Sequence, residues 1–190
     1  MKFETKVIHA GQQPDPRTGA VMTPIYATST YAQSSPGEHQ GFDYARTRNP
    51  TRDALQACIA ALEGGRAGFA FASGMAAIGT VLELLDSGSH VVAMDDLYGG
   101  SYRILERVRK RSAGLQASFV DLSKTENLEK ALKPNTRMVW VESPTNPLHK
   151  LVDLKAVAAI ARKRGLISVC DNTFASAWVE RLLEHGSGSV

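Results

Sequence analysis

The chain has 190 residues, of which 43% are hydrophobic, and its 22 Lys and Arg against 19 Asp and Glu give a net charge of +3. This size suits one globular domain, or one domain with a tail, and so mild a charge gives no reason to expect a nucleic-acid partner. The N-terminus lacks an apolar signal region and no apolar run is long enough to span a bilayer, so neither export nor membrane insertion is expected.

The two cysteines, Cys58 and Cys170, have no spacing typical of a metal or redox site. Cys58 falls on the apolar face of a predicted helix and Cys170 within a predicted strand. We therefore expect both to be reduced core residues of a cytoplasmic protein. None of the five histidines has a metal-ligand spacing relative to another, so no metal site is predicted.

Residues 1–48 differ from the rest of the chain, because prolines and glycines interrupt the segment and leave it without a helical period. The stretch 27–32 could form a short extended piece. Disorder is one interpretation of the segment. We favour an extended arm lying on a neighbouring subunit, because its apolar side chains are more numerous than in most disordered tails; they are Ile25, Tyr26, Tyr31, Phe42 and Tyr44.

From Asn49 onward, helices and strands alternate. Asn49 can cap a helix that has Pro50 at its first position, and Gly64 and Gly65 end it. Strands are predicted over 67–73, 90–95, 116–122, 136–142 and 166–171. Helices are predicted over 75–85, 101–111, 126–132, 154–164 and 177–184, with Asp153 capping the fourth of these. Such alternation predicts a mostly parallel sheet covered by helices on both faces, which makes 49–190 an α/β domain.

Polar residues follow several of the predicted strands, at the ends where open α/β sheets bind ligands. Asp171 ends the last strand, in the stretch Cys170-Asp171-Asn172-Thr173. Ser73-Gly74 forms a strand-to-helix turn, where the free N–H groups of a helix attract an anion. An ordinary tight turn is an equally good interpretation of that pair. Tyr98 follows another strand and could stack on a flat ring, although a structural role is the more common one.

Two further features complete the set of candidate residues. Asn146 follows the strand 136–142 and is either a turn former or a side chain directed to the same crevice. Tyr44 and Arg46 are two apart in an extended segment, so both point the same way and together suit a phosphate. Taken together, these residues suit a flat phosphorylated aromatic cofactor. Pyridoxal phosphate fits, because an Asp beside its ring nitrogen keeps that nitrogen protonated.

Five motifs in this order carry a resemblance to a known family: YARTRNPT (44–51), FASGMAA (71–77), MDDLYGG (94–100), VESPTNP (141–147) and CDNTFAS (170–176). They closely resemble the Cys/Met-metabolism pyridoxal-phosphate (PLP) enzymes, the cystathionine γ-lyase and γ-synthase family. The resemblance runs from about His9 to Glu184. It implies the large domain of the fold-type I (aspartate aminotransferase-like) PLP enzymes.

The resemblance also implies roles for single residues. The backbone of Gly74 and Met75 would hold the cofactor phosphate, and Tyr44 and Arg46 would reach the phosphate of a neighbouring subunit's cofactor. Tyr98 would stack on the ring and assist proton transfer. Asn146 would contact the hydroxyl side of the ring, Asp171 the ring nitrogen, and Thr173 would support the ring. A homotetramer, built as a dimer of dimers, is the usual assembly of the family.

The departures from the family pattern concern the end of the chain. The lysine that holds the cofactor lies in a Ser-x-Thr-Lys motif downstream of the aspartate, which would fall past Val190, and none of Lys150, Lys155 and Lys163 matches it. The small C-terminal domain is also absent. We therefore expect a fragment, truncated before the cofactor lysine, that is inactive alone.

Several functions remain open at this stage. The leading one is a transsulfuration enzyme, a carbon–sulfur lyase or γ-replacement transferase acting on cystathionine, homocysteine or cysteine. A truncated product that binds PLP or pairs with a full-length homologue is the second. A methionine γ-lyase is the third, although that group typically has a cysteine where this chain has Gly100. An aminotransferase and a Rossmann nucleotide-binding protein fit the motifs less well.

Overall fold

The computed structural model describes residues 1–186, and the chain divides into two compact units, one ending at Ala70 and the other beginning at Phe71. Each unit has its own elements and is described separately. The predicted arm, residues 1–48, falls within the first unit, together with the helix that follows it. Its contact with another subunit stays a prediction.

The first unit is built around the helix α2 (Pro50–Glu63). The side chain of Asn49 accepts hydrogen bonds from the N–H groups of Thr51, at 2.9 Å, and Arg52, at 3.4 Å. Gly64 ends the helix in the left-handed conformation, with φ of 72°, which glycine adopts without steric cost. Both ends of the predicted helix are therefore confirmed. A small antiparallel hairpin, β1 (Gln33–Ser35) with β2 (Glu38–His39), lies in the preceding segment.

The prediction that residues 1–48 hold no helix is wrong, because α1 (Phe3–His9) forms there. This helix packs against α2, and the sulfur of Cys58 lies 3.9 Å from the carbonyl oxygen of Val7. Gly11 allows the close approach, since a Cβ atom there would lie 2.7 Å from Cβ of Ala57. A helix of seven residues is too short to be stable by propensity, so it depends on this tertiary contact, which the sequence pattern does not display.

The predicted strand 67–73 is also wrong, since these residues form no strand. The N–H group of Ala70 donates to the side-chain oxygen of Gln56 at 2.9 Å. A Cβ atom on Gly68 would collide with the carbonyl oxygen of Gln56. The part of the segment in the first unit therefore packs on α2, and its backbone is bonded to a helix side chain rather than to a neighbouring strand.

The second unit contains a four-stranded sheet whose neighbouring strands are all parallel. Its order is β4-β3-β5-β6, and the strands are β3 (His90–Met94), β4 (Gln116–Val120), β5 (Thr136–Glu142) and β6 (Ile167–Asp171). These four strands confirm the α/β class predicted from the alternating pattern. Every residue of the central strand β3 is buried, as expected for a parallel sheet covered on both faces.

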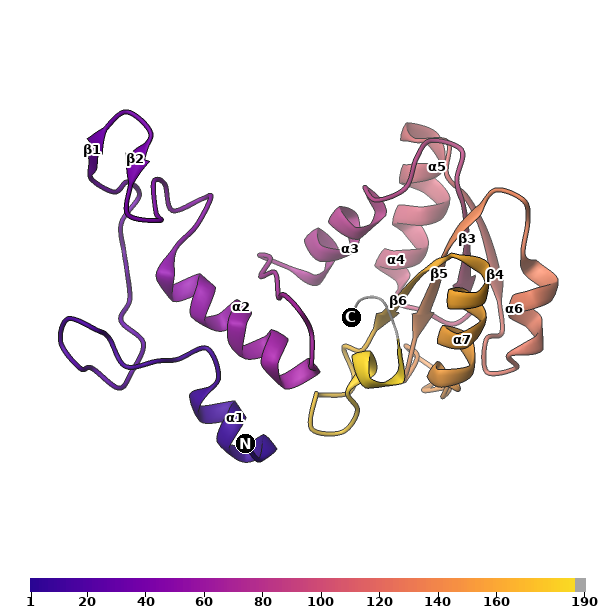
Figure 1. Ribbon diagram of the computed structural model, residues 1–190. Coiled ribbons are helices and arrows are strands. Elements are labelled where there is room, and N and C mark those ends of the chain that lie inside the picture. Colours follow the sequence, from indigo (N-terminus) through magenta and orange to yellow (C-terminus); the bar gives the residue numbers. More distant parts are fainter. Residues whose placement is uncertain (187–190) are drawn as a thin grey trace. The chain divides into compact units, whose positions relative to one another are not determined.

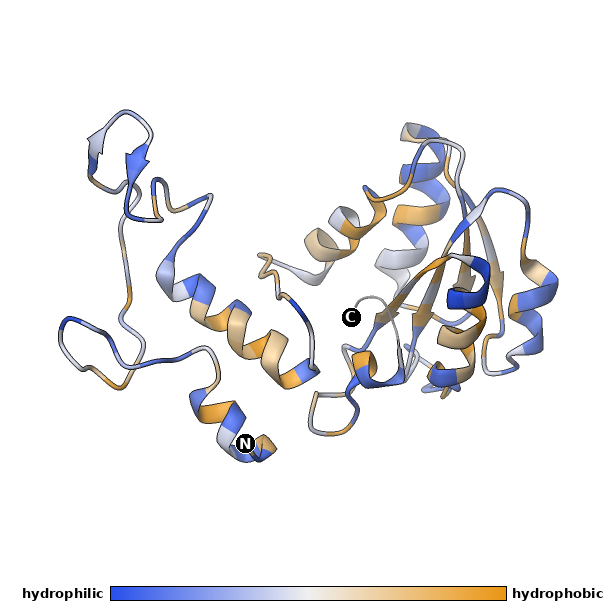
Figure 2. Ribbon diagram, viewed as in Figure 1, coloured by the Kyte–Doolittle hydropathy of each residue, from blue (hydrophilic) through white to orange (hydrophobic). Residues whose placement is uncertain are grey.

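Helices cover both faces of this sheet (Figure 1). One face carries α3 (Gly74–Leu82) and a continuous helical segment made of α4 (Gly99–Arg103), the π-helical turn η1 (Ile104–Arg109) and α5 (Lys110–Ser112). The other face carries α6 (Glu126–Ala131) and α7 (Leu154–Arg164). Asp153 caps α7 by accepting from the N–H group of Ala156 at 2.9 Å, as predicted. The inner strands are mostly hydrophobic and α6 is mostly hydrophilic, while α7 is mixed (Figure 2).

The predicted helix 177–184 is wrong, because only the short 3-10 turn η2 (Leu182–His185) forms in this region. The side-chain amide of Asn172 donates to the carbonyl oxygen of Glu180 at 3.4 Å, and Arg181 has an extended backbone. A carbonyl bonded to a side chain and an extended residue do not allow a helix to continue. Within residues 1–186, no helix has both the length and the apolar character needed to cross a membrane.

Candidate functional site

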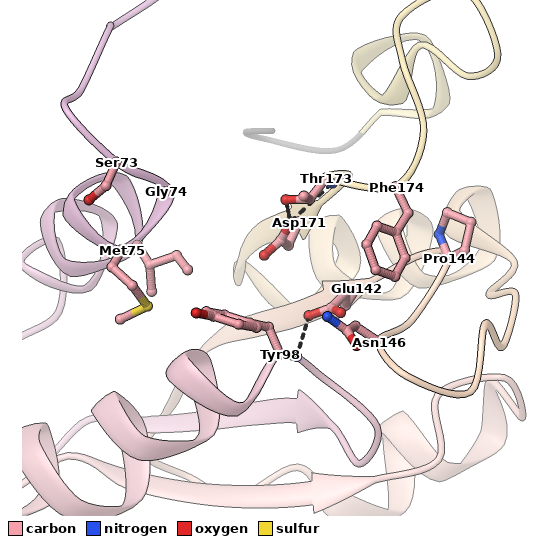
Figure 3. A pocket seen from close by; sticks show the side chains of 11 residues that line it. Ser73, Gly74, Met75, Tyr98, Glu142, Pro144, Asn146, Asp171, Thr173 and Phe174 are labelled. Carbon is pink, nitrogen blue, oxygen red and sulfur yellow. Dashed lines mark hydrogen bonds between the residues drawn. The ribbon is translucent and has the colours of Figure 1, made fainter.

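The parallel strands bring their carboxyl ends to one edge of the sheet, and a pocket of about 330 Å³ lies there (Figure 3). All of its lining residues belong to the second unit; they are Ser73, Gly74, Met75, Ile78, Tyr98, Glu142, Pro144, Asn146, Asp171, Thr173 and Phe174. Its volume lies in the range of about 300–1,000 Å³ that is usual for small-molecule sites. Seven of the residues singled out in the sequence therefore line one cavity: Ser73, Gly74, Met75, Tyr98, Asn146, Asp171 and Thr173.

The N-terminus of α3 supplies a site for an anion on one side of the pocket. The hydroxyl of Ser73 caps this helix by accepting from the N–H group of Ala76 at 3.2 Å. Gly74 and Met75 begin the helix, and the first N–H groups of a helix have no acceptor within it. A Cβ atom on Gly74 would meet no atom within 4 Å, so space for a ligand remains beside its backbone. Such an end binds phosphate groups well.

Tyr98 brings an aromatic ring into the pocket, and its side chain lies between Met75 and Glu142 (Figure 3). Gly100 makes room for this arrangement, because a Cβ atom there would collide with the ring of Tyr98 and lie 2.6 Å from the sulfur of Met75. Tyr98 as a whole residue is 43% exposed, which leaves surface for a ligand to cover. A flat ligand ring can stack in such a place.

Asp171 places a carboxylate on the wall formed by the end of β6. The N–H group of Thr173 donates to Oδ1 of Asp171 at 3.1 Å, and the hydroxyl of Thr173 donates to the same oxygen. These two bonds orient the Asp171 side chain. A fixed carboxylate suits a ligand group that is protonated, such as a pyridine nitrogen.

Glu142 is a pocket residue that the sequence reasoning missed. It ends β5, directly opposite Asp171 in the β5–β6 register, and is only 4% exposed. Its Oε2 accepts a hydrogen bond from the N–H group of Tyr98 at 2.8 Å. Burial raises the pKa of Glu142 to about 7, and the nearby Asp171 carboxylate adds to the rise. An acidic residue at the end of a buried strand, adjacent to the Pro144–Asn146 turn, was the signal that could have identified it.

Asn146 lies in the loop that follows β5, and this loop is held by several hydrogen bonds. The hydroxyl of Thr145 donates to Oδ2 of Asp96, and the N–H group of Leu148 donates to the same oxygen at 3.0 Å. The hydroxyl of Thr145 also accepts from the N–H group of Lys150 at 2.7 Å. The loop that presents Asn146 is therefore well ordered by internal contacts.

Tyr44 and Arg46 belong to the first unit, not to the part of the chain that builds the pocket. The guanidinium carbon of Arg46 lies 5.1 Å from the centroid of the Tyr44 ring, so the two side chains do lie together as predicted. Arg52 anchors their segment by donating to the carbonyl oxygens of Ala45, Arg46 and Thr47 at 3.1, 3.2 and 2.8 Å. A phosphate-binding role for this pair stays a prediction.

The donor set of the pocket fits pyridoxal phosphate. Free N–H groups for a phosphate lie at Gly74 and Met75, an aromatic ring for stacking at Tyr98, an amide at Asn146 and an oriented carboxylate at Asp171. No lysine is among the residues that line the pocket in the described chain. The ammonium group of Lys150 instead contacts the carboxylates of Asp95, at 3.1 Å, and Asp121, at 3.8 Å. No group of three or more His, Cys, Asp and Glu within residues 1–186 is arranged to hold a metal ion.

Comparison with known proteins identifies relatives along nearly the whole chain. Cystathionine beta-lyase of Coxiella burnetii is 61% identical over 97% of this chain and 48% of its own length. Cystathionine gamma-lyase of Bacillus subtilis is 49% identical over 100% of this chain and 50% of its own length. The crystal structure of cystathionine gamma-lyase from Lactobacillus plantarum complexed with L-serine matches 98% of this chain and 49% of its own, with a TM-score of 0.94 and 45% identity. The chain thus spans about half the length of the relatives it matches.

The family model described as Cys/Met metabolism PLP-dependent enzyme matches residues 4–190. This range includes all five motifs on which the resemblance rested, and the residues that line the pocket. The chain belongs to the Cys/Met metabolism PLP-dependent enzyme family.

Proposed function

We propose that this chain forms the cofactor-binding part of a PLP-dependent enzyme of transsulfuration, acting on cystathionine, homocysteine or cysteine. The observation that carries the proposal is the single pocket in which the N-terminus of α3, the ring of Tyr98 and the carboxylate of Asp171 meet. The relatives support the substrate class, because they are named as cystathionine lyases and synthases.

Six of the pocket-lining residues have a role in this proposal. The N–H groups of Gly74 and Met75 bind the phosphate, the ring of Tyr98 stacks on the pyridine ring, and Asn146 contacts its hydroxyl side. Asp171, oriented by Thr173, keeps the ring nitrogen protonated. When bound, PLP supplies an electron sink for the bonds at the α-carbon of an amino acid. Tyr98 has its phenol in the pocket and is our candidate for moving a proton.

The reaction is proposed as elimination or replacement at the side chain of a sulfur amino acid. The names of the relatives include a beta-lyase, a gamma-synthase and gamma-lyases, so they favour no single outcome. A methionine γ-lyase is the less favoured alternative. That group typically has a cysteine at the position of Gly100. In this chain any side chain at position 100 would press on Tyr98 and Met75, which supports the lower ranking of this alternative.

Assembly belongs to the same proposal. In a homotetramer built as a dimer of dimers, Tyr44 and Arg46 would contribute to the phosphate site of a neighbouring subunit. Their mutual contact and the anchoring of their segment by Arg52 support a built phosphate-binding element. We also propose a cytoplasmic location, which suits the two buried, unpaired cysteines.

A second candidate function is cofactor binding without turnover by the 190-residue chain alone. The observation that favours it is the lack of a lysine among the pocket-lining residues of the described chain. Cystathionine cleavage by the isolated chain with added PLP would contradict this second candidate and leave the first one standing.

PLP binding by the chain tests the proposal. Titration followed by the absorbance of PLP should show saturable binding to one site per chain. Asp171→Asn should weaken this binding by roughly tenfold or more, because one charged hydrogen bond is lost. Asp121→Asn is the matched control, since Asp121 directly follows β4 but does not line the pocket. Equal affinities for wild type and Asp171→Asn would contradict the proposed site.

A further inference from the structure

Two loops at the edge of the sheet are cross-linked in both directions. The first follows β3 and contains Asp96 and Tyr98; the second follows β5 and contains Thr145. In one direction, Oδ2 of Asp96 accepts from the hydroxyl of Thr145 and from the N–H group of Leu148 in the second loop. In the other direction, Oε2 of Glu142, the last residue of β5, accepts from the N–H group of Tyr98 in the first loop at 2.8 Å.

The groups that make these links are buried. Thr145 is 0%, Glu142 4% and Asp96 9% exposed. A buried carboxyl is costly unless it is hydrogen-bonded, and losing one partner leaves the other unsatisfied. The hydroxyl of Thr145 also accepts a hydrogen bond from the N–H group of Lys150, which lies in the same loop. This one hydroxyl therefore links Thr145 both to Lys150 in its own loop and to Asp96 in the other loop.

The links determine how two pocket residues are spaced. Tyr98 comes from the first loop and Asn146 from the second, and both line the same pocket, whereas Asp96 and Thr145 do not. In the first loop the bonds are made by Asp96 and by Tyr98 itself, and in the second loop they are made by Glu142, Thr145 and Leu148, which lie on either side of Asn146. A shift of one loop relative to the other would break hydrogen bonds in both directions at once.

We propose that Asp96, Glu142 and Thr145 form a clamp that holds Tyr98 and Asn146 at a fixed separation, and that they are positioning residues for the ring-binding part of the pocket. The effect of the clamp on PLP binding rests on the proposed function. The clamp itself does not, because its hydrogen bonds join groups of this chain only.

Asp95 provides a contrast within the same loop. Its carboxylate accepts from the ammonium group of Lys150 at 3.1 and 3.2 Å, and its side chain is 38% exposed. Exposed ion pairs contribute little to stability. Asp95→Ala therefore removes a neighbouring carboxylate that makes none of the clamp's hydrogen bonds, which makes it the matched control for Asp96→Ala.

The test compares the whole chain with its variants Thr145→Val, Thr145→Ser, Asp96→Ala and Asp95→Ala. Hydrogen–deuterium exchange of the peptide containing Tyr98, measured by mass spectrometry, reports opening of the Tyr98–Glu142 bond. The affinity for PLP is measured on the same samples. The clamp predicts that Thr145→Val, which keeps the side-chain shape but loses the hydroxyl, speeds exchange at Tyr98 by roughly tenfold or more. Thr145→Ser, which retains the hydroxyl, and Asp95→Ala should exchange like wild type.

Each outcome decides a separate claim. Unchanged exchange at Tyr98 in Thr145→Val overturns the clamp, and if that variant does not fold, Asp96→Ala, which removes the acceptor of both bonds, decides the question in the same way. If wild type binds PLP, weaker binding by Thr145→Val and normal binding by Thr145→Ser support the positioning role, and equal binding overturns it. If wild type does not bind PLP, the proposed function fails, and the exchange measurement still decides the clamp.

Discussion

At the scale of single residues, the pocket combines groups that favour ligand groups of opposite charge. The N-terminus of α3 favours an anion, while Glu142 and Asp171 end adjacent strands and favour a proton or a cation. A ligand that carries a phosphate at one end and a protonated nitrogen at the other satisfies both. Burial, with a further contribution from the nearby Asp171 carboxylate, raises the pKa of Glu142 to about 7.

The raised pKa of Glu142 predicts a pH-dependent difference in stability. Its pKa is about 7 in the folded chain and near the ordinary 4.5 in the unfolded chain, so between these values the folded state binds more protons. Stability conferred by the protonated carboxyl is therefore lost as the pH rises through this window.

Glu142→Gln retains an oxygen acceptor for Tyr98 but cannot ionise. Urea unfolding should show the variant gaining stability relative to wild type between pH 5 and 7.5, with a slope below about 1.4 kcal/mol per pH unit. A constant difference would contradict the assignment.

Gly100 predicts a packing effect on the pocket. Gly100→Ala should displace the ring of Tyr98 or the side chain of Met75 and weaken PLP binding by about tenfold, which corresponds to the lower end of overpacking costs. Gly79→Ala is the control, because it also adds a methyl group to a helical glycine but meets only Cδ1 of Ile104 at 3.7 Å. Wild-type affinity in Gly100→Ala, measured by absorbance titration, would show that the ring is not constrained there.

At the scale of elements, the sequence predicts what is local and misses what is not. Strands β3, β4, β5 and β6 fall within the predicted ranges, because buried apolar runs between turn residues are a local signal. The strand 67–73 was wrongly predicted, since strand formation requires a partner and its Ala70 bonds to Gln56 instead. Helix α1 was missed because its stability depends on α2.

The same distinction applies to the site. Tyr98 and Asn146 follow strands and Asp171 ends one, so topology alone predicts that these three meet at one edge of the sheet, whereas Gly74 begins α3 and follows no strand in the structure. Glu142 was missed because the register that places it opposite Asp171 and the bond that it accepts from Tyr98 depend on the three-dimensional structure.

Packing of α6 on the sheet provides a prediction at this scale. Leu128 is 0% exposed, so Leu128→Ala should lower the free energy of unfolding by about 2–5 kcal/mol, because it removes buried methyl groups and leaves a cavity. Leu84→Ala is the matched control, since Leu84 is 66% exposed and its loss should change stability by less than about 0.5 kcal/mol. Equal urea midpoints for the two variants would contradict this description of the core.

At the scale of the whole molecule, the chain matches about half the length of its relatives and exposes large apolar side chains. In the second unit these include Leu148, Leu151, Trp178 and Val179, each more than 60% exposed, with fractions of 67, 70, 65 and 73%. Exposed apolar side chains that form a contiguous patch usually mark a surface that another chain or segment covers. The exposure also agrees with a site that is completed by association.

The exposed apolar residues predict self-association of the isolated chain. Size-exclusion chromatography with light scattering should give a mass above the 20.5 kDa of one chain. The double substitution Leu151→Ser and Val179→Ser should move the distribution toward the monomer, because it reduces the apolar area available for contact. A monodisperse monomer of the wild-type chain would contradict the expectation.

The central claim is that PLP binds at the strand ends, with its phosphate on α3 and its ring nitrogen at Asp171. The most direct test is the hydrogen-exchange pattern of the whole chain with and without PLP. Bound PLP should slow exchange in the segments that contain Gly74–Ala76, Tyr98 and Asp171–Phe174, and inorganic phosphate should protect the first of these alone. Unchanged exchange in these three segments, or protection confined to other parts of the chain such as α6, would contradict it.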